Sequence, residues 1–238
     1  MTRARWRVAA IAGIGAAALA IAVSRREPAE LQLRPPGARP TLLLLTSLPL
    51  VLPEQFTIKG GGSPALRAIE TRYRVVPISV TDPAELAKGR LLLMAQPLAQ
   101  PAEDLVALDA WVRGGGCVLL LADPMLDWPS SRPLGDPLRP PPMFMDTGLL
   151  AHWGLRLDAP DDRGPREGSL AGHQILTESP GRLVGGCSIG DGALVAHCRI
   201  GKGRVTIIAD ADFLDAERLG RSENLDSLLG ELAALQRG

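Results

Sequence analysis

The feature that most constrains the fold of this chain is one stretch near its middle, residues 104–127, in which a helix-like pattern leads into a short apolar run. Apolar residues recur at helical spacing from Leu105 to Val112, three glycines follow at 114–116, and residues 117–122 are all apolar. A strand that is apolar on both faces belongs in the middle of a parallel sheet covered by helices. We therefore expect the part of the chain outside any membrane to be an α/β domain.

The residues before this stretch alternate between strand-like and helix-like patterns. The expected strands are Thr41–Leu45, Tyr73–Val80 and Arg90–Ala95, and the expected helices between them are Ala65–Arg72 and Asp82–Lys88. Such alternation with short connections is typical of parallel strands joined by right-handed crossovers. The pattern predicts a mostly parallel sheet flanked by helices.

The second half of the chain is less regular until its end. We expect a short helix at 146–153, a strand at 155–157 and a solvent-exposed loop at 158–169. Two strand-like runs, Leu194–Ile200 and Arg204–Ala209, flank a short glycine turn and predict a β-hairpin. A last helix, 223–236, carries leucines at helical spacing that predict one buried stripe.

The beginning of the chain has the pattern of a membrane segment. Residues 8–23 carry no charge, and arginines flank them at positions 3, 5 and 7 and at 25 and 26. The apolar run is short for a spanning helix but long for the core of a signal peptide, and we favour an uncleaved transmembrane anchor over a cleaved signal. The slight excess of arginine before the run favours a cytoplasmic N-terminus and an exported domain.

This pattern divides the chain into three parts. Residues 1–26 form the anchor or signal segment, residues 27–40 form a tether rich in proline and arginine, and residues 41–238 form the α/β domain. The expected location is the bacterial inner membrane, crossed once, with the domain on the periplasmic side.

Composition argues against several classes of function. Lys plus Arg and Asp plus Glu each total 26, so no net charge is available to hold a polyanion, and nucleic acid is not an expected partner. No phosphate-binding P-loop occurs, and no Gly-x-Ser-x-Gly elbow is expected between a strand and a helix. The three histidines lack metal-ligand spacing, so we expect no metal site and no cofactor.

The three cysteines form no C-x-x-C pair. Cys117 begins the central strand, at the end opposite the expected ligand crevice, so we interpret it as a buried thiol and not as a nucleophile. Cys187 and Cys198 could pair in an oxidising compartment if their strands adjoin, but we expect unpaired, half-buried thiols.

Candidate ligand-binding residues follow the expected strands. Thr46 and Ser47 leave the first strand, Asp123 leaves the central one, and Asp210 and Asp212 leave the last. In an open α/β sheet these positions converge on one crevice at the carboxyl edge, where carboxylates could hold a cation or the hydroxyls of a sugar. The alternative is that the aspartates cap turns after strands, as aspartates commonly do.

A proline-rich segment, which we call the flap (residues 129–142), follows the central strand. Its six prolines exclude regular structure. We expect it to extend along the carboxyl edge, either as a lid over a ligand or as plain covering or disordered chain.

Three segments of the chain look familiar: Thr41-Leu-Leu-Leu-Leu-Thr-Ser-Leu-Pro-Leu, the helix end Arg113-Gly-Gly-Gly with the strand Cys117-Val-Leu-Leu-Leu-Ala-Asp-Pro, and Gly201-Lys-Gly-Arg-Val-Thr-Ile-Ile-Ala-Asp-Ala-Asp-Phe-Leu. Together they resemble the GldG-like family of ABC-transporter auxiliary proteins. The members of that family are membrane-anchored domains related in shape to class I glutamine amidotransferases but without the catalytic cysteine.

The resemblance implies a flavodoxin-like, amidotransferase-like domain and a non-enzymatic role beside the ATPase and permease subunits of an ABC transporter. Asn224 falls where that family often has an Asn opening the last helix. Family members are often longer than this chain, with extra domains and a further membrane span.

Two other functions stay open. One is a carboxylate-based hydrolase acting on envelope glycans, which needs two carboxylates held apart as acid and base. The other is a structural membrane scaffold.

Overall fold

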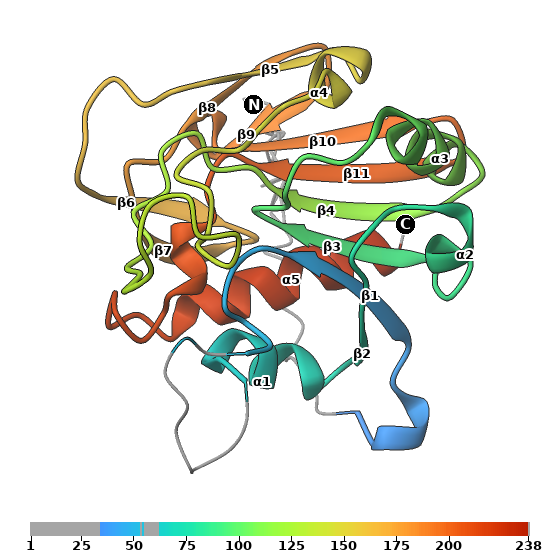
Figure 1. Ribbon diagram of the computed structural model, residues 1–238, viewed down its shortest axis with the longest axis horizontal. Helices are drawn as coiled ribbons and strands as arrows, with labels where there is room; N and C mark the ends of the chain where they lie inside the picture. Colours follow the sequence, from blue (N-terminus) through green and yellow to red (C-terminus); the bar gives the residue numbers. More distant parts are fainter. Residues whose placement is uncertain (1–33, 53, 55–61, 238) are drawn as a thin grey trace, which may run out of the picture.

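The structure, a computed structural model, describes residues 34–52, 54 and 62–237. Its centre is a seven-stranded sheet with the order β2-β1-β3-β4-β11-β10-β9 (Figure 1). The strands are β1 (Thr41–Thr46), β2 (Arg74–Pro77), β3 (Leu91–Ala95), β4 (Cys117–Leu121), β9 (Ser188–Gly190), β10 (Val195–Ile200) and β11 (Gly203–Ile208). The strands from β2 to β11 in this order are parallel, whereas β10 runs antiparallel to both of its neighbours. The expected α/β architecture with a largely parallel sheet is confirmed.

Helices cover both faces of this sheet. They are α1 (Pro64–Glu70), α2 (Pro83–Leu86), α3 (Ala102–Arg113), α4 (Leu149–His152) and α5 (Glu223–Arg237), with short 3-10 turns η1 (Pro36–Ala38), η2 (Asp191–Ala193) and η3 (Asp212–Leu214). Helices α1 and α5 pack against each other on one face, and α2 and α3 on the other (Figure 1). Every residue of β3 is therefore buried, which explains why its sequence shows no polar alternation.

Local backbone chemistry sets several element boundaries. Helix α3 ends at Arg113, and Gly115 then takes φ +112°, a conformation that favours glycine, as the glycine run predicts. Strand β2 lies at the edge of the sheet, where a proline is tolerated, and it is shorter than expected because its last residue is Pro77. Helix α4 is also shorter than expected, since Gly148, directly before it, takes φ +99°.

Two antiparallel pairs extend beyond the central sheet. Strand β5 (Leu155–Asp158) pairs with β8 (Arg182–Gly185), and β6 (Pro165–Leu170) pairs with β7 (His173–Glu178). The prediction of a loop over 158–169 is wrong in its second half, where β6 begins. Only the last residue of β6 is buried, so its sequence lacks an apolar pattern, and the strand exists because the turn at Gly172 pairs it with β7.

Cys187 and Cys198 form a disulfide, so the expectation of unpaired thiols is wrong. Cys187 directly precedes β9, and the pairing of His197 with Ser188 sets Cys198 opposite it, with the two Cα atoms 5.0 Å apart. Cys117 remains a free, half-buried thiol at the start of β4.

The expected membrane segment, residues 8–23, and the tether before residue 34 lie outside the described residues. None of the helices in the described part of the chain has the length and hydropathy of a membrane span.

Candidate functional site

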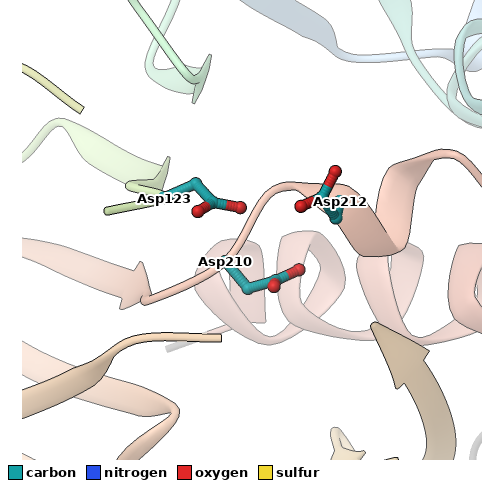
Figure 2. Close-up of side chains that lie close together, drawn as sticks. All are labelled: Asp123, Asp210 and Asp212. Carbon is teal, nitrogen blue, oxygen red and sulfur yellow. The ribbon is translucent and has the colours of Figure 1, made fainter. Parts of the chain in front are cut away.

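Three of the predicted site residues form one cluster at the carboxyl edge of the sheet (Figure 2). Asp123 follows β4, and Asp210 and Asp212 follow β11, its direct neighbour. One carboxylate oxygen from each residue lies within 4.8 Å of the other two, and all three residues are 0% exposed. The structure thus brings these three aspartates together but leaves them out of contact with solvent.

Each of the three carboxylates accepts hydrogen bonds from the backbone of the surrounding loops. The pairs are Met125 N to Asp123 Oδ1 (2.8 Å), Ala211 N to Asp123 Oδ2 (3.0 Å), Phe213 N to Asp210 Oδ1 (3.0 Å) and Asp127 N to Asp212 Oδ2 (2.8 Å). These bonds satisfy buried amides just beyond the strands, where the chain leaves the sheet ladder. The aspartates therefore fix the conformation of the loops that carry them.

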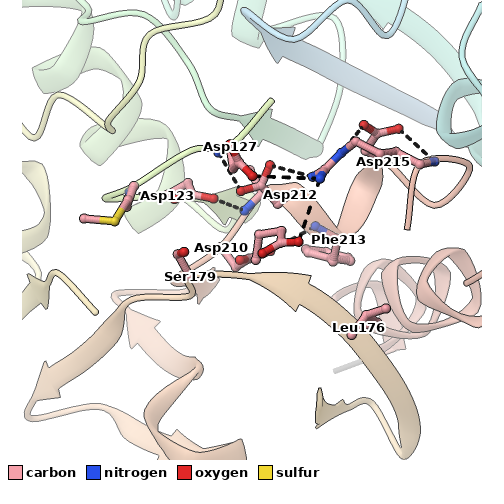
Figure 3. Close-up of polar contacts among 12 residues, drawn as sticks. Asp123, Asp127, Leu176, Ser179, Asp210, Asp212, Phe213 and Asp215 are labelled. Atoms are coloured by element: carbon pink, nitrogen blue, oxygen red, sulfur yellow. Dashed lines mark hydrogen bonds and ion pairs between the residues drawn. The ribbon is translucent and has the colours of Figure 1, made fainter. Parts of the chain in front are cut away.

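The hydrogen bonds leave part of the cluster unsatisfied. Asp210 Oδ2 and Asp212 Oδ1 are buried and have no hydrogen-bond partner among the described residues, although Arg218 Nη2 lies 3.5 Å from Asp212 Oδ1. Other nitrogens of the same Arg218 guanidinium lie 2.9 Å from a carboxylate oxygen of Asp215 and 3.9 Å from one of Asp127, two residues labelled in Figure 3. The single positive charge of Arg218 thus lies beside more carboxylates than it can neutralise.

Burial determines the protonation of the cluster. It raises the pKa of Asp123 to about 6 and, with the added effect of the Asp123 charge, the pKa of Asp212 to about 7. Burial and the charges of both neighbours raise the pKa of Asp210 well above its ordinary value. Such a cluster can share protons among its oxygens at neutral pH, and its spacing also suits a hard cation such as Ca²⁺.

Thr46 and Ser47 lie apart from the cluster. The Thr46 hydroxyl donates to Ala95 O at 2.8 Å, and the Ser47 hydroxyl donates to Gln96 O. Both residues line a separate hollow of about 350 Å³, together with Arg132 and other residues of the flap. The five predicted residues therefore belong to two places along the carboxyl edge instead of one crevice.

Gln96 joins these two places and was not among the predicted site residues. It is 0% exposed; its Nε2 donates to Asp123 O at 3.1 Å and to Pro141 O at 3.3 Å, and its Oε1 accepts from Asp123 N at 2.9 Å. Gln96 is the first residue after β3, so the rule that selected Asp123, a polar residue directly after a buried strand, would also have selected it.

The flap contains no helix or strand, as its prolines predict, and it is fastened to the carboxyl edge. Glu54 accepts hydrogen bonds from the Ser130 and Ser131 hydroxyls at the start of the flap, and Phe144 N, just beyond its end, donates to Asp123 O at 2.6 Å. The flap thus covers this edge and ties it to the backbone of the Asp123 loop.

Asn224, at the start of α5, links β7 to the loop that carries Asp210 and Asp212. It is 0% exposed, and its Nδ2 donates to Leu176 O at 2.7 Å and to Phe213 O at 2.9 Å, while its Oδ1 accepts from Leu176 N at 3.0 Å. All of its amide groups are used within the protein, so it fixes η3 against β7.

The sequence significantly matches no protein-family model and no curated protein. Its structure is similar to the N-terminal domain of mmIFT52, with a TM-score of 0.57 at 12% identity over 83% of this chain and 98% of that one. It is also similar to the cytoplasmic protein STM3548 from Salmonella typhimurium, with a TM-score of 0.51 at 10% identity over 82% of this chain and 98% of that one.

A third similar structure is the exo-beta-1,4-mannosidase Op5Man5 from Opitutaceae bacterium strain TAV5, with a TM-score of 0.51 at 15% identity over 83% of this chain. The match spans only 36% of the mannosidase. At these identities the three likenesses show the fold alone.

Proposed function

We propose that this chain is a non-enzymatic accessory or binding component of an ABC-type transport system, anchored in the inner membrane of a bacterium by residues 8–23. Its domain is of the flavodoxin-like, class I amidotransferase-like type and lies on the periplasmic side. The observation that carries the non-enzymatic role is the burial of the aspartate cluster at the carboxyl edge. There Asp123, Asp210 and Asp212 are 0% exposed and accept hydrogen bonds from the backbone of the two loops after β4 and β11, so a substrate has no access to them.

The position after β4 supports the same conclusion. In the related enzymes to which the sequence resemblance points, a nucleophile follows a strand on a sharp turn. Here Asp123 and Pro124 occupy the corresponding place, and the free thiol of Cys117 lies at the other end of the strand.

The disulfide supports the periplasmic location. Structural disulfides persist in oxidising compartments such as the periplasm and are rare in the cytosol. Alkylating intact cells before lysis, followed by electrophoresis with and without reductant, should show Cys187 and Cys198 paired; a Cys187→Ser/Cys198→Ser variant is the control. Free thiols at both Cys187 and Cys198 in the wild-type protein would contradict an exported domain.

The partners, an ABC ATPase and permease, are proposed from the sequence resemblance. The test is an affinity pull-down of the tagged full-length protein from gently solubilised membranes, with the bound proteins identified by mass spectrometry. The matched control is residues 1–40 fused to an unrelated soluble domain, which keeps the anchor and removes the α/β domain. Enrichment of an ATPase and a permease over this control supports the proposal, and equal recovery from both baits contradicts it.

A glycan hydrolase remains the alternative because Asp123 and Asp212 have pKa values of about 6 and about 7, a range suited to acid–base catalysis. Assays of the purified protein on envelope glycans test this directly. Hydrolysis that disappears in both Asp123→Asn and Asp212→Asn, with folding retained, would replace the accessory role with an enzymatic one. A pure scaffold would instead recover neighbours of many kinds in the pull-down.

A further inference from the structure

An open hollow of about 800 Å³ lies at the amino edge of the sheet, opposite the aspartate cluster. Its walls come from the starts of β1, β3, β4 and β11 and from the end of α5, at the right-hand side of Figure 1. Five basic residues line it: Lys88, Arg90, Lys202, Arg204 and Arg237. The lining residues include no aspartate or glutamate.

Most of this positive charge is not neutralised by the rest of the domain. Lys88 forms an ion pair with Glu85, whereas the other four basic residues form none with the carboxylates that the structure describes. With five basic and no acidic lining residues, the hollow is a local concentration of positive charge in a chain that has no net charge. Such a concentration attracts anions.

Two of the arginines are set in place by the fold. The Arg90 Nη2 donates to Gly115 O at 3.1 Å, and a Cβ on Gly115 would lie only 2.8 Å from that nitrogen, so the glycine leaves room for the guanidinium. The Arg204 Nη2 donates to Leu235 O, while its Nε is buried and has no hydrogen-bond partner among the described residues. A buried donor without an acceptor is costly unless a ligand supplies one.

Guanidinium and ammonium groups around a polar hollow suit a phosphate group, whose oxygens accept several charge-assisted hydrogen bonds at once. The place of the hollow in the chain indicates where such a group would come from. Pro40 and Thr41, where the tether enters β1, line the hollow. Residues 24–39 can separate it from the expected membrane segment by at most about 55 Å.

We propose that this basic hollow binds the phosphate headgroup of an anionic phospholipid in the membrane that holds the chain. The inference rests on the proposed membrane attachment but not on the ABC partners. Bound headgroups would hold the amino edge of the sheet against the bilayer and turn the carboxyl edge away from it. Attraction of juxtamembrane basic residues to anionic lipids is a known source of membrane affinity.

The test uses the purified full-length protein in micelles of an uncharged detergent. Isothermal titration calorimetry follows the addition of three soluble probes: dihexanoyl-phosphatidylglycerol, dihexanoyl-phosphatidylcholine and inorganic phosphate. The variant Lys202→Gln/Arg237→Gln removes two exposed charges from the hollow, and the matched control Arg163→Gln/Arg166→Gln removes two exposed charges far from it. Thermal melting of each variant checks that the fold is kept.

Phosphatidylglycerol should bind the wild-type protein more tightly than either other probe does. Its affinity for the Lys202→Gln/Arg237→Gln variant should be about 10- to 30-fold weaker, and its affinity for the control variant should equal that for the wild type. Equal losses in both variants, or equal binding of phosphatidylcholine, would overturn the proposal. If inorganic phosphate binds as tightly as the lipid, with the same dependence on Lys202 and Arg237, the proposed lipid ligand is wrong. The ligand of the hollow is then a free phosphate anion. Because the titration contains no transporter subunit, a failed pull-down contradicts the ABC role alone.

Discussion

The two edges of the central sheet differ in both charge and access. At the carboxyl edge, Asp123, Asp210 and Asp212 are buried and accept hydrogen bonds from backbone amides. At the amino edge, five basic side chains line an open hollow. A chain with equal numbers of acidic and basic residues thus gathers buried acidic groups at one edge of the folded sheet and basic groups at the other.

This difference shows that the position of a charged group in a fold does not determine whether it binds a ligand or stabilises the structure. The carboxyl edge is where open α/β sheets ordinarily bind ligands, yet here its carboxylates are used to hold loops. The amino edge is ordinarily remote from function, yet it carries the larger hollow, about 800 Å³ against about 350 Å³. The predictions that follow test whether the first edge is structural and the second is free to bind.

The largest expected effect is the loss of the Asp123 carboxylate. The substitution Asp123→Ala leaves the amides of Met125 and Ala211 buried without partners, so we expect the free energy of unfolding to fall by about 3 kcal/mol. Denaturant unfolding followed by circular dichroism measures it. The control Asp127→Ala, whose side chain is 70% exposed, should stay within about 0.5 kcal/mol of the wild type. Unchanged stability together with lost partner binding would make the cluster a binding site instead.

Asn224 should come next. Replacing it with Ala removes hydrogen bonds to both backbone groups of Leu176 and to Phe213 O, and we expect a loss of about 2 kcal/mol. Asp226→Ala, exposed and less than a turn further along α5, is the control. Hydrogen exchange at η3 and β7 should rise in the first variant only; a change confined to α5 would contradict the proposed link between these elements.

The third prediction concerns pH. In the folded protein, Asp123 and Asp212 have pKa values of about 6 and about 7, above the ordinary 3.8, so they bind protons more tightly folded than unfolded. Their stabilising contribution is complete below about pH 4 and is lost as the pH rises through 6 to 7. We expect these two groups to make unfolding at pH 8 require on the order of 2 kcal/mol less than at pH 6.

The variant Asp212→Asn should show a smaller difference between the two pH values, since it removes one of the titrating groups. A wild-type protein more stable at pH 8 than at pH 6 would show that the carboxylates are charged in the folded state and that neighbouring groups compensate the charge. If Ca²⁺ restores stability at pH 8 in the wild type but not in Asp210→Asn, a cation takes the place of the shared proton.

The smallest effect is expected at the open edge. Lys202→Gln/Arg237→Gln should leave the free energy of unfolding within about 0.5 kcal/mol of the wild type, because both side chains are exposed and make no ion pair with a described carboxylate. Thermal melting in 0.15 M salt measures this. A clear gain in stability would show instead that the hollow is strained by repulsion among its own charges.

Much of the fold could be predicted from local pattern. The strands around Leu92 and Leu119 are apolar on both faces, and Gly115 ends the helix between them, so the class of the fold and the direction of these strands follow from neighbouring residues. The meeting of Asp123 with Asp210 also follows, because parallel strands end at the same edge.

The remaining features depend on which distant segments meet. The disulfide requires β9 and β10 to pair, β6 forms only against β7, and the basic hollow gathers side chains between Lys88 and Arg237. Above all, the sequence places carboxylates at an edge without showing whether water reaches them. By itself the sequence determined the strands, the helices and the edge at which the aspartates lie, since these follow from local spacing. Only the tertiary structure decided burial, pairing and charge separation, because these depend on how the whole chain packs together.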